Sequence, residues 1–213
     1  MLKMSKDEIF KDKSAAAGSF TFDDSVAAVF PDMLQRSIPG YAMTLEAIGA
    51  LAARYVAAGT RCYDLGCSLG AATLAMRRHI REPGCEIHAV DLADAMVRRC
   101  REIVARDESQ TPVFVDAGDV RDVEIRNASM VVMNYTLQFL PPGDREGLIR
   151  RIHDGMTEGG VFVLSEKVAD DDPVVESLLV DLHHDFKRAN DYSTLEIARK
   201  RSALENVLIP ETT

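Results

Sequence analysis

A glycine-containing turn carries the residue types that could bind a ligand. In residues 61–76, RCYDLGCSLGAATLAM, an apolar strand pattern ends on Asp64 and a helical pattern follows. The turn between them contains Gly66, Cys67, Ser68 and Gly70. Glycines permit positive φ angles and let another molecule approach the backbone, and a helix start offers unpaired N–H groups with a partial positive charge. The turn is therefore the first candidate for a binding site.

The spacing of polar residues narrows the kind of ligand. The turn reads Gly66-x-x-x-Gly70, without the second glycine of the G-x-G-x-x-G dinucleotide pattern, so a group smaller than a pyrophosphate fits better. Asp91 ends the next strand pattern, where a carboxylate can accept hydrogen bonds from both hydroxyls of a ribose. Asp119 follows the third strand pattern and is placed to face an adenine, and Asn134 ends the fourth. Together they describe an adenosine pocket.

Each of these residues also has a purely structural interpretation. Gly66 and Gly70 could serve only the turn. Asp91 could cap the following helix, and Asn134 could be a satisfied loop amide. Their occurrence together, in this order and at the ends of successive strands, favours the nucleoside site.

The elements that must position these residues alternate regularly. Val, Ile and Met dominate the apolar segments, and amphipathic helices separate them, which predicts right-handed βαβ units. The predicted strands are 61–65, 86–91, 113–116, 130–135 and 161–166, and the predicted helices between them are 71–80, 93–105 and 144–156. The fold class is therefore α/β, a doubly wound, mostly parallel sheet with helices on both faces.

Further helices flank this core. We expect extra N-terminal helices over 22–38, kinked or broken at Pro31, and over 41–55, lying over the opening of the sheet. The C-terminal part is helical from Val174 and again over 193–207, and no strand is predicted after Leu208.

Domain boundaries follow from composition. Residues 1–20 are rich in Lys, Asp, Ser and Ala and are expected to form a mobile arm. Residues 21–213 are expected to form a single domain, because roughly 100–200 residues per domain is usual and α/β domains often run longer.

Composition also limits the partners and the compartment. The 213 residues are 46% hydrophobic and 28% charged, with a net charge of −9, so direct nucleic-acid binding and anionic membranes are disfavoured. The N-terminal residues lack an apolar signal segment, and no run approaches the roughly 20 apolar residues of a membrane span. The four cysteines have no CxxC spacing, which is typical of reduced thiols. We expect a cytoplasmic protein.

The usual catalytic and metal patterns are weak. No metal is expected, because the histidines do not combine with Cys or carboxylates at ligand spacing; they are His79, His88, His153, His183 and His184. Cys67 could be a nucleophile, but a small buried residue is favoured. Tyr-Thr-Leu follows Asn134 where methyltransferases of amino groups have Asn-Pro-Pro-Tyr, so methylation of a base amine is disfavoured.

Several longer sequence segments resemble those of a known protein family. They are FPDMLQRSIPGY at 30–41, YDLGCSLGAATL at 63–74, NASMVVMNYTLQFLPP at 127–142, LSEK at 164–167 and HHDFKRANDYSTLEIARKRSALENVL at 183–208. These segments resemble the carboxy-S-adenosyl-L-methionine synthase family, within the Rossmann-like S-adenosyl-L-methionine-dependent methyltransferases. They extend from about residue 20 to the end. The family continues beyond this chain with a terminal helix and a strand pair.

The resemblance implies a reaction. S-adenosyl-L-methionine and prephenate would give carboxy-S-adenosyl-L-methionine and phenylpyruvate, and a partner enzyme, a tRNA carboxymethyltransferase, would use the product on hydroxylated wobble uridine. The expected mechanism is loss of carbon dioxide and hydroxide from prephenate beside the sulfonium methyl, which is deprotonated and takes up the carbon dioxide. A homodimer is implied by an apolar helical face at 174–186, although that face could equally point to the core.

The resemblance also implies the ligand contacts. They are Tyr41, Gly66, Cys67, Ser68, Asp91, Leu92, Asp119, Val120, Asn134 and Arg201. Tyr41 and Arg201 are expected closest to the new carboxylate and are the implied catalytic residues, since a guanidinium binds a carboxylate bidentately. Leu92 stands where the family commonly has Asn, so one polar contact to the nucleoside is lost. Two other functions stay open: a methyltransferase of a small acceptor, and a non-catalytic carrier of the nucleoside.

Overall fold

The structure, a computed structural model, describes residues 6–11, 20–205 and 207–212. The chain forms two compact units, each treated by itself below. The central unit is Ala42–Glu166, and the terminal unit combines Met1–Tyr41 with Lys167–Thr213. The expectation of one domain over 21–213 stays a prediction.

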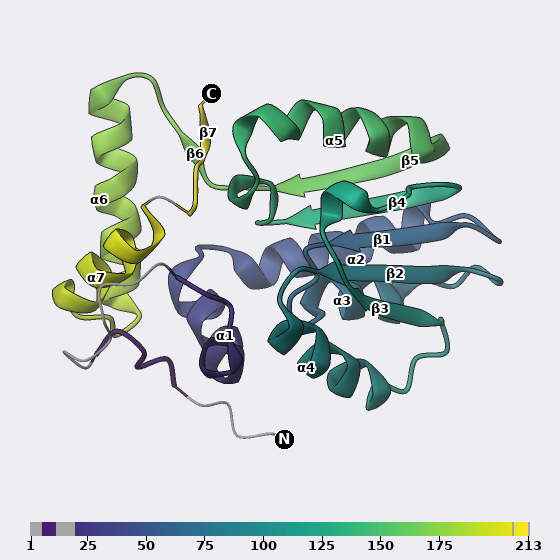
Figure 1. Cartoon of the computed structure of the whole chain (residues 1–213), viewed down its shortest axis with the longest axis horizontal. Coiled ribbons are helices and arrows are strands. Elements are labelled where there is room, and N and C mark those ends of the chain that lie inside the picture. Colours follow the sequence, from purple (N-terminus) through teal and green to yellow (C-terminus); the bar gives the residue numbers. More distant parts are fainter. Residues whose placement is uncertain (1–5, 12–19, 206, 213) are drawn as a thin grey trace. The chain divides into compact units, whose positions relative to one another are not determined.

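The central unit is built on a five-stranded parallel sheet. Its strand order is β3-β2-β1-β4-β5, as Figure 1 shows. The strands are β1 (Arg61–Leu65), β2 (Glu86–Asp91), β3 (Val113–Ala117), β4 (Ala128–Asn134) and β5 (Met156–Ser165). Since all five run in one direction, their carboxyl ends lie at one edge of the sheet.

Alternation along the strands gives the sheet two apolar faces. On one face, buried Cys62 packs with residues of α2 (Tyr41–Tyr55) and α3 (Ala71–His79), and α4 (Asp94–Ala105) covers β2 and β3. On the other face, Tyr63 packs with α5 (Pro142–Gly155). Helices therefore cover both faces, and the predicted fold class is confirmed.

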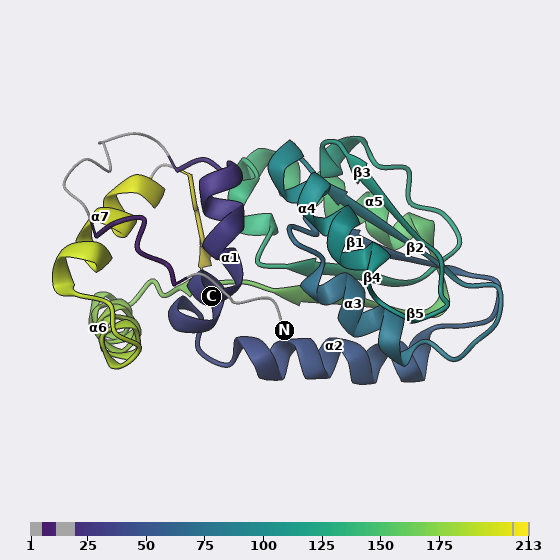
Figure 2. The ribbon, with the colours of Figure 1, turned by 90° about the horizontal axis from the view of Figure 1, so that it is seen from below.

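Helix α2 lies on the sheet face beside α3 (Figure 2). Its Ile48 is fully buried, and a Cβ on Gly49 would lie 3.2 Å from the backbone oxygen of Ala75 on α3, a tight contact, so glycine eases the close packing of the two helices. Burying a side chain such as Ile48 stabilises the fold by about 1.5–3 kcal/mol. The expectation that this helix lies over the opening of the sheet is wrong, because its apolar stripe packs against β1, β2 and β4.

Strand β5 differs most from its predicted bounds. It begins at Met156, whereas the sequence predicted a start at Val161 after a Gly159-Gly160 turn. Gly159 does have a positive φ of 76°, and the pairing register between β4 and β5 shifts there. A strand can continue past such an irregularity when glycine absorbs it, so the glycine pair interrupts the pairing without ending the strand.

The terminal unit contains three helices and a short strand pair in the part that is described. They are α1 (Asp24–Ser37), α6 (Pro173–Ala189), α7 (Thr194–Leu204), β6 (Val168–Ala169) and β7 (Glu211–Thr212). Asp23, Asp172 and Ser193 cap the three helices through their side chains. Of the kink or break predicted at Pro31, the break is wrong because helix α1 continues through that residue, and the kink stays a prediction. Strand β7 also corrects the prediction that no strand follows Leu208.

The segment 6–11 contacts the helices of the terminal unit. Asp7 is only 1% exposed, and its carboxylate accepts a hydrogen bond from Oη of Tyr192 at 2.5 Å. A guanidinium nitrogen of Arg36 donates to its backbone oxygen at 3.1 Å. The expected mobility of residues 1–20 stays a prediction, and 1–5 and 12–19 lie outside the described residues. None of the helices in the described part of the chain has the length and apolar character needed to cross a membrane.

Candidate functional site

The β1–α3 turn depends on its glycines. Gly66 and Gly70 have φ angles of 85° and 83°, a region that favours glycine. A Cβ on Gly66 would lie 2.2 Å from Oγ1 of Thr136, which follows β4. Glycine at this position therefore lets the turn approach the end of the neighbouring strand.

The N–H groups of this turn are bonded within the chain. Those of Gly66 and Cys67 donate to the backbone oxygen of Val90 at 2.8 and 3.0 Å. That of Ser68 donates to Oδ2 of Asp91 at 2.8 Å. The sequence suggested that these three amides could hold an anionic group. Because each already donates to an acceptor within the chain, they are poor candidates for that role. The backbone oxygen of Gly66 accepts only a long bond of 3.5 Å, from Thr136, so the turn better suits a positively charged amino group.

Asp91 joins the turn to the end of β2. Its Oδ1 accepts the N–H of Ala93 at 2.9 Å while Oδ2 accepts that of Ser68, and burial raises its pKa. An ionised carboxylate can accept about four hydrogen bonds, so two positions remain for a pair of hydroxyls. Ser68 itself has a positive φ of 49°, which is uncommon for a residue with a side chain. Leu92, directly after Asp91, is 74% exposed.

Asp64 stabilises the same turn through a hydrogen bond to the first turns of α3. It is almost fully buried at the end of β1, and Oγ1 of Thr73 on α3 donates to it at 2.5 Å. Burial raises the pKa of this carboxyl to about 6. Asp64 thus fixes the strand to the start of the helix and is a supporting residue of the site.

The end of β4 carries a buried polar atom that needs a partner. Oδ1 of Asn134 is the one buried side-chain oxygen or nitrogen in the described ranges that lacks a hydrogen bond. Leaving such an atom unpaired costs about 1–3 kcal/mol. The next residue, Tyr135, has a positive φ of 61°, a backbone strain that concentrates at ligand sites. Asn134 is therefore suited to a ligand with a hydrogen-bond donor.

Glu166 holds the turn after Asn134 in place. Its carboxylate accepts the backbone N–H groups of Thr136, Leu137 and Gln138 at 3.0, 2.7 and 3.2 Å. Burial raises its pKa to about 7. Glu166 was not among the residues predicted from the sequence, although an acidic side chain directly after β5 follows the same rule that identified Asp91.

Asp119 is engaged by a neighbouring cation. Oδ2 of Asp119 lies 2.6 Å from a guanidinium nitrogen of Arg121, and this contact lowers the pKa of the carboxyl. Asp119 also caps a short 3-10 helix, Val120–Asp122, in which Val120 is buried. An adenine amino group would have to share the carboxylate with Arg121.

The predicted contacts divide between the two units. The carboxyl edge of the central unit carries Gly66, Cys67, Ser68, Asp91, Leu92, Asp119, Val120 and Asn134. Tyr41 and Arg201 belong to the terminal unit. The ligand role of each residue stays a prediction.

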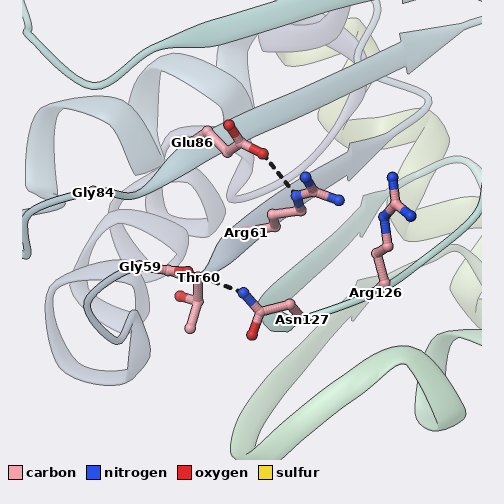
Figure 3. A pocket seen from close by; sticks show the side chains of 7 residues that line it. All are labelled: Gly59, Thr60, Arg61, Gly84, Glu86, Arg126 and Asn127. Atoms are coloured by element: carbon pink, nitrogen blue, oxygen red, sulfur yellow. Dashed lines mark hydrogen bonds and ion pairs between the residues drawn. The ribbon is translucent and has the colours of Figure 1, made fainter.

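A pocket of about 360 Å³ lies at the opposite edge of the sheet, among the starts of β1, β2 and β4 (Figure 3). Nε of Arg61 donates to Glu86 at 2.6 Å, and Arg126 pairs with Glu124 at 3.5 Å. Both cations near this pocket therefore have a carboxylate partner. Because ligands of open parallel sheets bind at the carboxyl edge, the pocket is separate from the candidate site.

The chemistry of the carboxyl edge fits a nucleoside with a cationic chain. Asp91 can accept ribose hydroxyls, the Gly66 oxygen can accept an ammonium, and Asn134 offers an unpaired oxygen. The thiol of Cys67 is buried, and its contact with Cys100 followed by burial raises its pKa, so a thiolate nucleophile is disfavoured. Within the described ranges, no three His, Cys, Asp or Glu side chains gather as a metal site would require.

Solved structures share the fold. An S-adenosyl-L-methionine-dependent methyltransferase from Methanococcus maripaludis, itself assigned only provisionally, covers 89% of this chain and 86% of its own at a TM-score of 0.55, with 18% identity. A structure described as a DhpI-SAM-HEP complex covers 73% and 66% at a TM-score of 0.54, with 16% identity. These similarities support the methyltransferase fold alone.

Sequence comparison identifies the family. A profile described as a methyltransferase domain matches residues 63–162. The carboxy-S-adenosyl-L-methionine synthase of Aliivibrio salmonicida is 57% identical over 96% of this chain and 85% of its own length. That of Citrifermentans bemidjiense is 56% identical over 97% and 85%. The family resemblance of the sequence segments is thereby confirmed, and this chain belongs to the carboxy-S-adenosyl-L-methionine synthase family.

Proposed function

We propose that this chain converts S-adenosyl-L-methionine and prephenate into carboxy-S-adenosyl-L-methionine and phenylpyruvate. The observation that carries the proposal is 57% identity, along 96% of the chain, to a protein named carboxy-S-adenosyl-L-methionine synthase. The carboxyl edge of the central unit supports it, because Asp91, Asn134 and the Gly66 oxygen suit the substrate nucleoside and its amino group.

The proposed reaction balances without a further reagent. Prephenate breaks down to phenylpyruvate, carbon dioxide and hydroxide. The hydroxide removes a proton from the sulfonium methyl group of the other substrate and becomes water, and the methyl carbon forms a bond to the carbon dioxide. The chain contributes confinement and orientation of the two substrates. It also excludes bulk water, which would dilute the hydroxide and the carbon dioxide.

Arg201 and Tyr41 are the proposed contacts to the new carboxylate. Arg201 is exposed and, among the described residues, no carboxylate lies within ion-pairing distance of it. A planar guanidinium can hold a carboxylate through two parallel hydrogen bonds. A methyltransferase product lacks this carboxylate, so Arg201 is the residue that separates the two activities.

The remaining proposed contacts hold the nucleoside and methionine parts. They are Gly66, Cys67, Ser68, Asp91, Leu92, Asp119, Val120 and Asn134. We propose Asp91 for the ribose hydroxyls and Asp119 with Val120 for the adenine. No metal takes part in this scheme.

The use of the product, the cellular compartment and the oligomeric state are also proposals. The product would pass to a tRNA carboxymethyltransferase that modifies wobble uridine to its 5-oxyacetic acid form. Direct binding of the tRNA by this chain is disfavoured by its net charge of −9. Four buried thiols suit the cytoplasm, and exposed apolar residues along α6 suit a homodimer.

A methyltransferase of a small acceptor is the second candidate, favoured by the methyltransferase-domain match over residues 63–162. The two activities leave different ligands on the protein. Mass spectrometry of the ligand that co-purifies separates them: a species heavier than S-adenosyl-L-methionine by one carboxyl group supports the synthase, and S-adenosylhomocysteine supports the methyltransferase. A carboxylated ligand on a protein that forms none from prephenate would indicate a carrier.

A further inference from the structure

Two consecutive residues at the end of β5 hold the backbone that follows β4. The backbone oxygen of Ser165 accepts the N–H of Tyr135 at 2.7 Å. The carboxylate of Glu166 accepts the next three N–H groups along the chain. They belong to Thr136, Leu137 and Gln138, at 3.0, 2.7 and 3.2 Å. The four successive amides of residues 135–138 are therefore all fixed by the end of β5.

Tyr135 needs this support because its backbone is strained. Its φ of 61° lies in the left-handed region, which is uncommon for a residue with a side chain. Such a conformation persists only where the surrounding structure fixes it. Ser165 holds the N–H of Tyr135 itself, and Glu166 holds the N–H of the residue that follows. The strained residue is thereby fixed on both sides.

The strained residue directly follows the clearest ligand acceptor of the carboxyl edge. Oδ1 of Asn134 is buried, and within the described ranges it finds no hydrogen-bond partner. Asn134 is the last residue of β4 and pairs with Ser165 in the sheet. The direction in which the chain leaves this residue is set at Tyr135. A change at Tyr135 would consequently move the peptide group of Asn134 and its side chain with it.

We propose that Glu166 is a positioning residue for S-adenosyl-L-methionine, which holds Tyr135 in its strained conformation and so keeps Oδ1 of Asn134 directed at the ligand. This inference rests on the proposed function for the identity of that ligand. Glu166 acts through Asn134 and does not touch the ligand. A carboxylate suits the task because its two oxygens together can accept about four hydrogen bonds. The amide of a glutamine accepts at one end only.

Glu166→Gln tests the proposal with little change in side-chain size. The substitution replaces one acceptor oxygen by an N–H donor, so at least one of the three amides loses its partner. The measurement is titration calorimetry at pH 8, above the Glu166 pKa of about 7, on protein freed of bound ligand. S-adenosyl-L-methionine should bind about tenfold more weakly. Its KM should rise similarly, while kcat and the KM for prephenate stay within about twofold.

A double-mutant cycle shows whether this loss passes through Asn134. Asn134→Ala removes the oxygen that Glu166 is proposed to orient and should itself weaken binding of S-adenosyl-L-methionine by about tenfold. In that background Glu166→Gln should change the affinity by less than about threefold, because the oriented oxygen is already gone. A larger additional loss would overturn the proposal, since it would mean that Glu166 acts on the whole site. Unchanged affinity in Glu166→Gln alone would overturn it too.

Ile48→Val is the control for lost stability. Ile48 is fully buried in the central unit, in the cluster on the sheet face covered by α2. Its substitution should lower the melting temperature and leave the affinity for S-adenosyl-L-methionine within about twofold of the original. If Glu166→Gln does not fold, Glu166→Asp carries both tests. It withdraws the carboxylate by one methylene group, and unchanged binding there would overturn the proposal.

Failure of the proposed function would look different. A chain that follows the predicted cycle in its affinity for S-adenosyl-L-methionine, but forms no carboxylated product from prephenate, retains the positioning role and loses the synthase activity. A chain that forms the product in Glu166→Gln with an unaltered KM for S-adenosyl-L-methionine retains the activity and loses the positioning role.

Discussion

At the scale of single residues, the central unit and the terminal unit supply different chemistry. The carboxyl edge offers acceptors for a nucleoside, of which the unpaired Oδ1 of Asn134 and the partly engaged carboxylate of Asp91 are the clearest. The terminal unit offers the guanidinium of Arg201.

Arg201→Ala tests the proposed contact to the new carboxylate. Loss of a bidentate, charge-assisted pair should weaken retention of carboxy-S-adenosyl-L-methionine by about tenfold to a hundredfold. S-adenosyl-L-methionine lacks the carboxylate and should bind within about twofold of its original affinity. Equilibrium dialysis with each ligand makes the comparison. Equal losses for both ligands would remove Arg201 from this role.

The sequence located the glycine turn and the polar residues at the strand ends, whose ligand roles stay predictions, but it did not reveal how these residues are bonded within the chain. Gly66 and Asp91 follow from rules about strand ends and turns, which depend only on local order. The hydrogen bonds from the turn N–H groups to Val90 and Asp91 could not be predicted, because they depend on how β1 and β2 pair.

At the scale of elements, one carboxylate orders the segment after β4. Glu166 bonds three consecutive N–H groups at the start of the 3-10 helix Leu137–Phe139. This contact fixes the segment that contains Thr136, which in turn packs against Gly66. The end of β5 thereby determines the shape of the turn between β4 and α5.

Glu166→Gln should change the pH dependence of stability. Burial raises the pKa of Glu166 from 4.5 to about 7, so the folded chain holds this proton more tightly than the unfolded chain. The stability that the proton contributes is full below about pH 4.5 and is lost as the pH rises through about 7. The melting temperature of the original chain should fall more between pH 5 and pH 8 than that of Glu166→Gln.

Glu124→Gln is the control for that measurement. Glu124 is an exposed glutamate of the same unit, and its side chain is 75% accessible. It should leave the slope of melting temperature against pH unchanged. Asp64, with a pKa of about 6, contributes equally to all three proteins. Parallel slopes for Glu166→Gln and the original chain would show that Glu166 does not titrate in this range.

At the scale of the whole molecule, the sequence predicted the parallel sheet of the central unit but missed the full length of β5 and the β6–β7 pair of the terminal unit. Regular βαβ alternation predicted a parallel sheet with helices on both faces, whereas the length of β5 depends on a glycine irregularity within the strand. The pairing of β6 with β7 joins two-residue strands, which are too short to give an alternation pattern. Helix α6 leaves apolar side chains exposed, namely Val174, Val175, Leu178, Leu179 and Leu182.

Leu178→Glu tests whether this exposed stripe forms the proposed homodimer. Leu178 is 56% exposed in the single chain, and a charge placed in an apolar interface loses its hydration without gaining a partner. Sedimentation velocity should find a dimer for the original chain and a monomer for Leu178→Glu. Ser177→Glu puts the same charge on the adjacent exposed position, outside the apolar stripe, and should remain dimeric. Equal sedimentation of all three proteins would exclude this face as the interface.

The central claim is that the chain makes carboxy-S-adenosyl-L-methionine. Purified protein, freed of bound ligand, should be incubated with S-adenosyl-L-methionine whose methyl carbon is labelled and with prephenate, and the products followed by mass spectrometry. The account predicts equal amounts of phenylpyruvate and of a sulfonium product that carries one additional carboxyl group on the labelled carbon. Formation of S-adenosylhomocysteine, or release of phenylpyruvate without any carboxylated product, would contradict it.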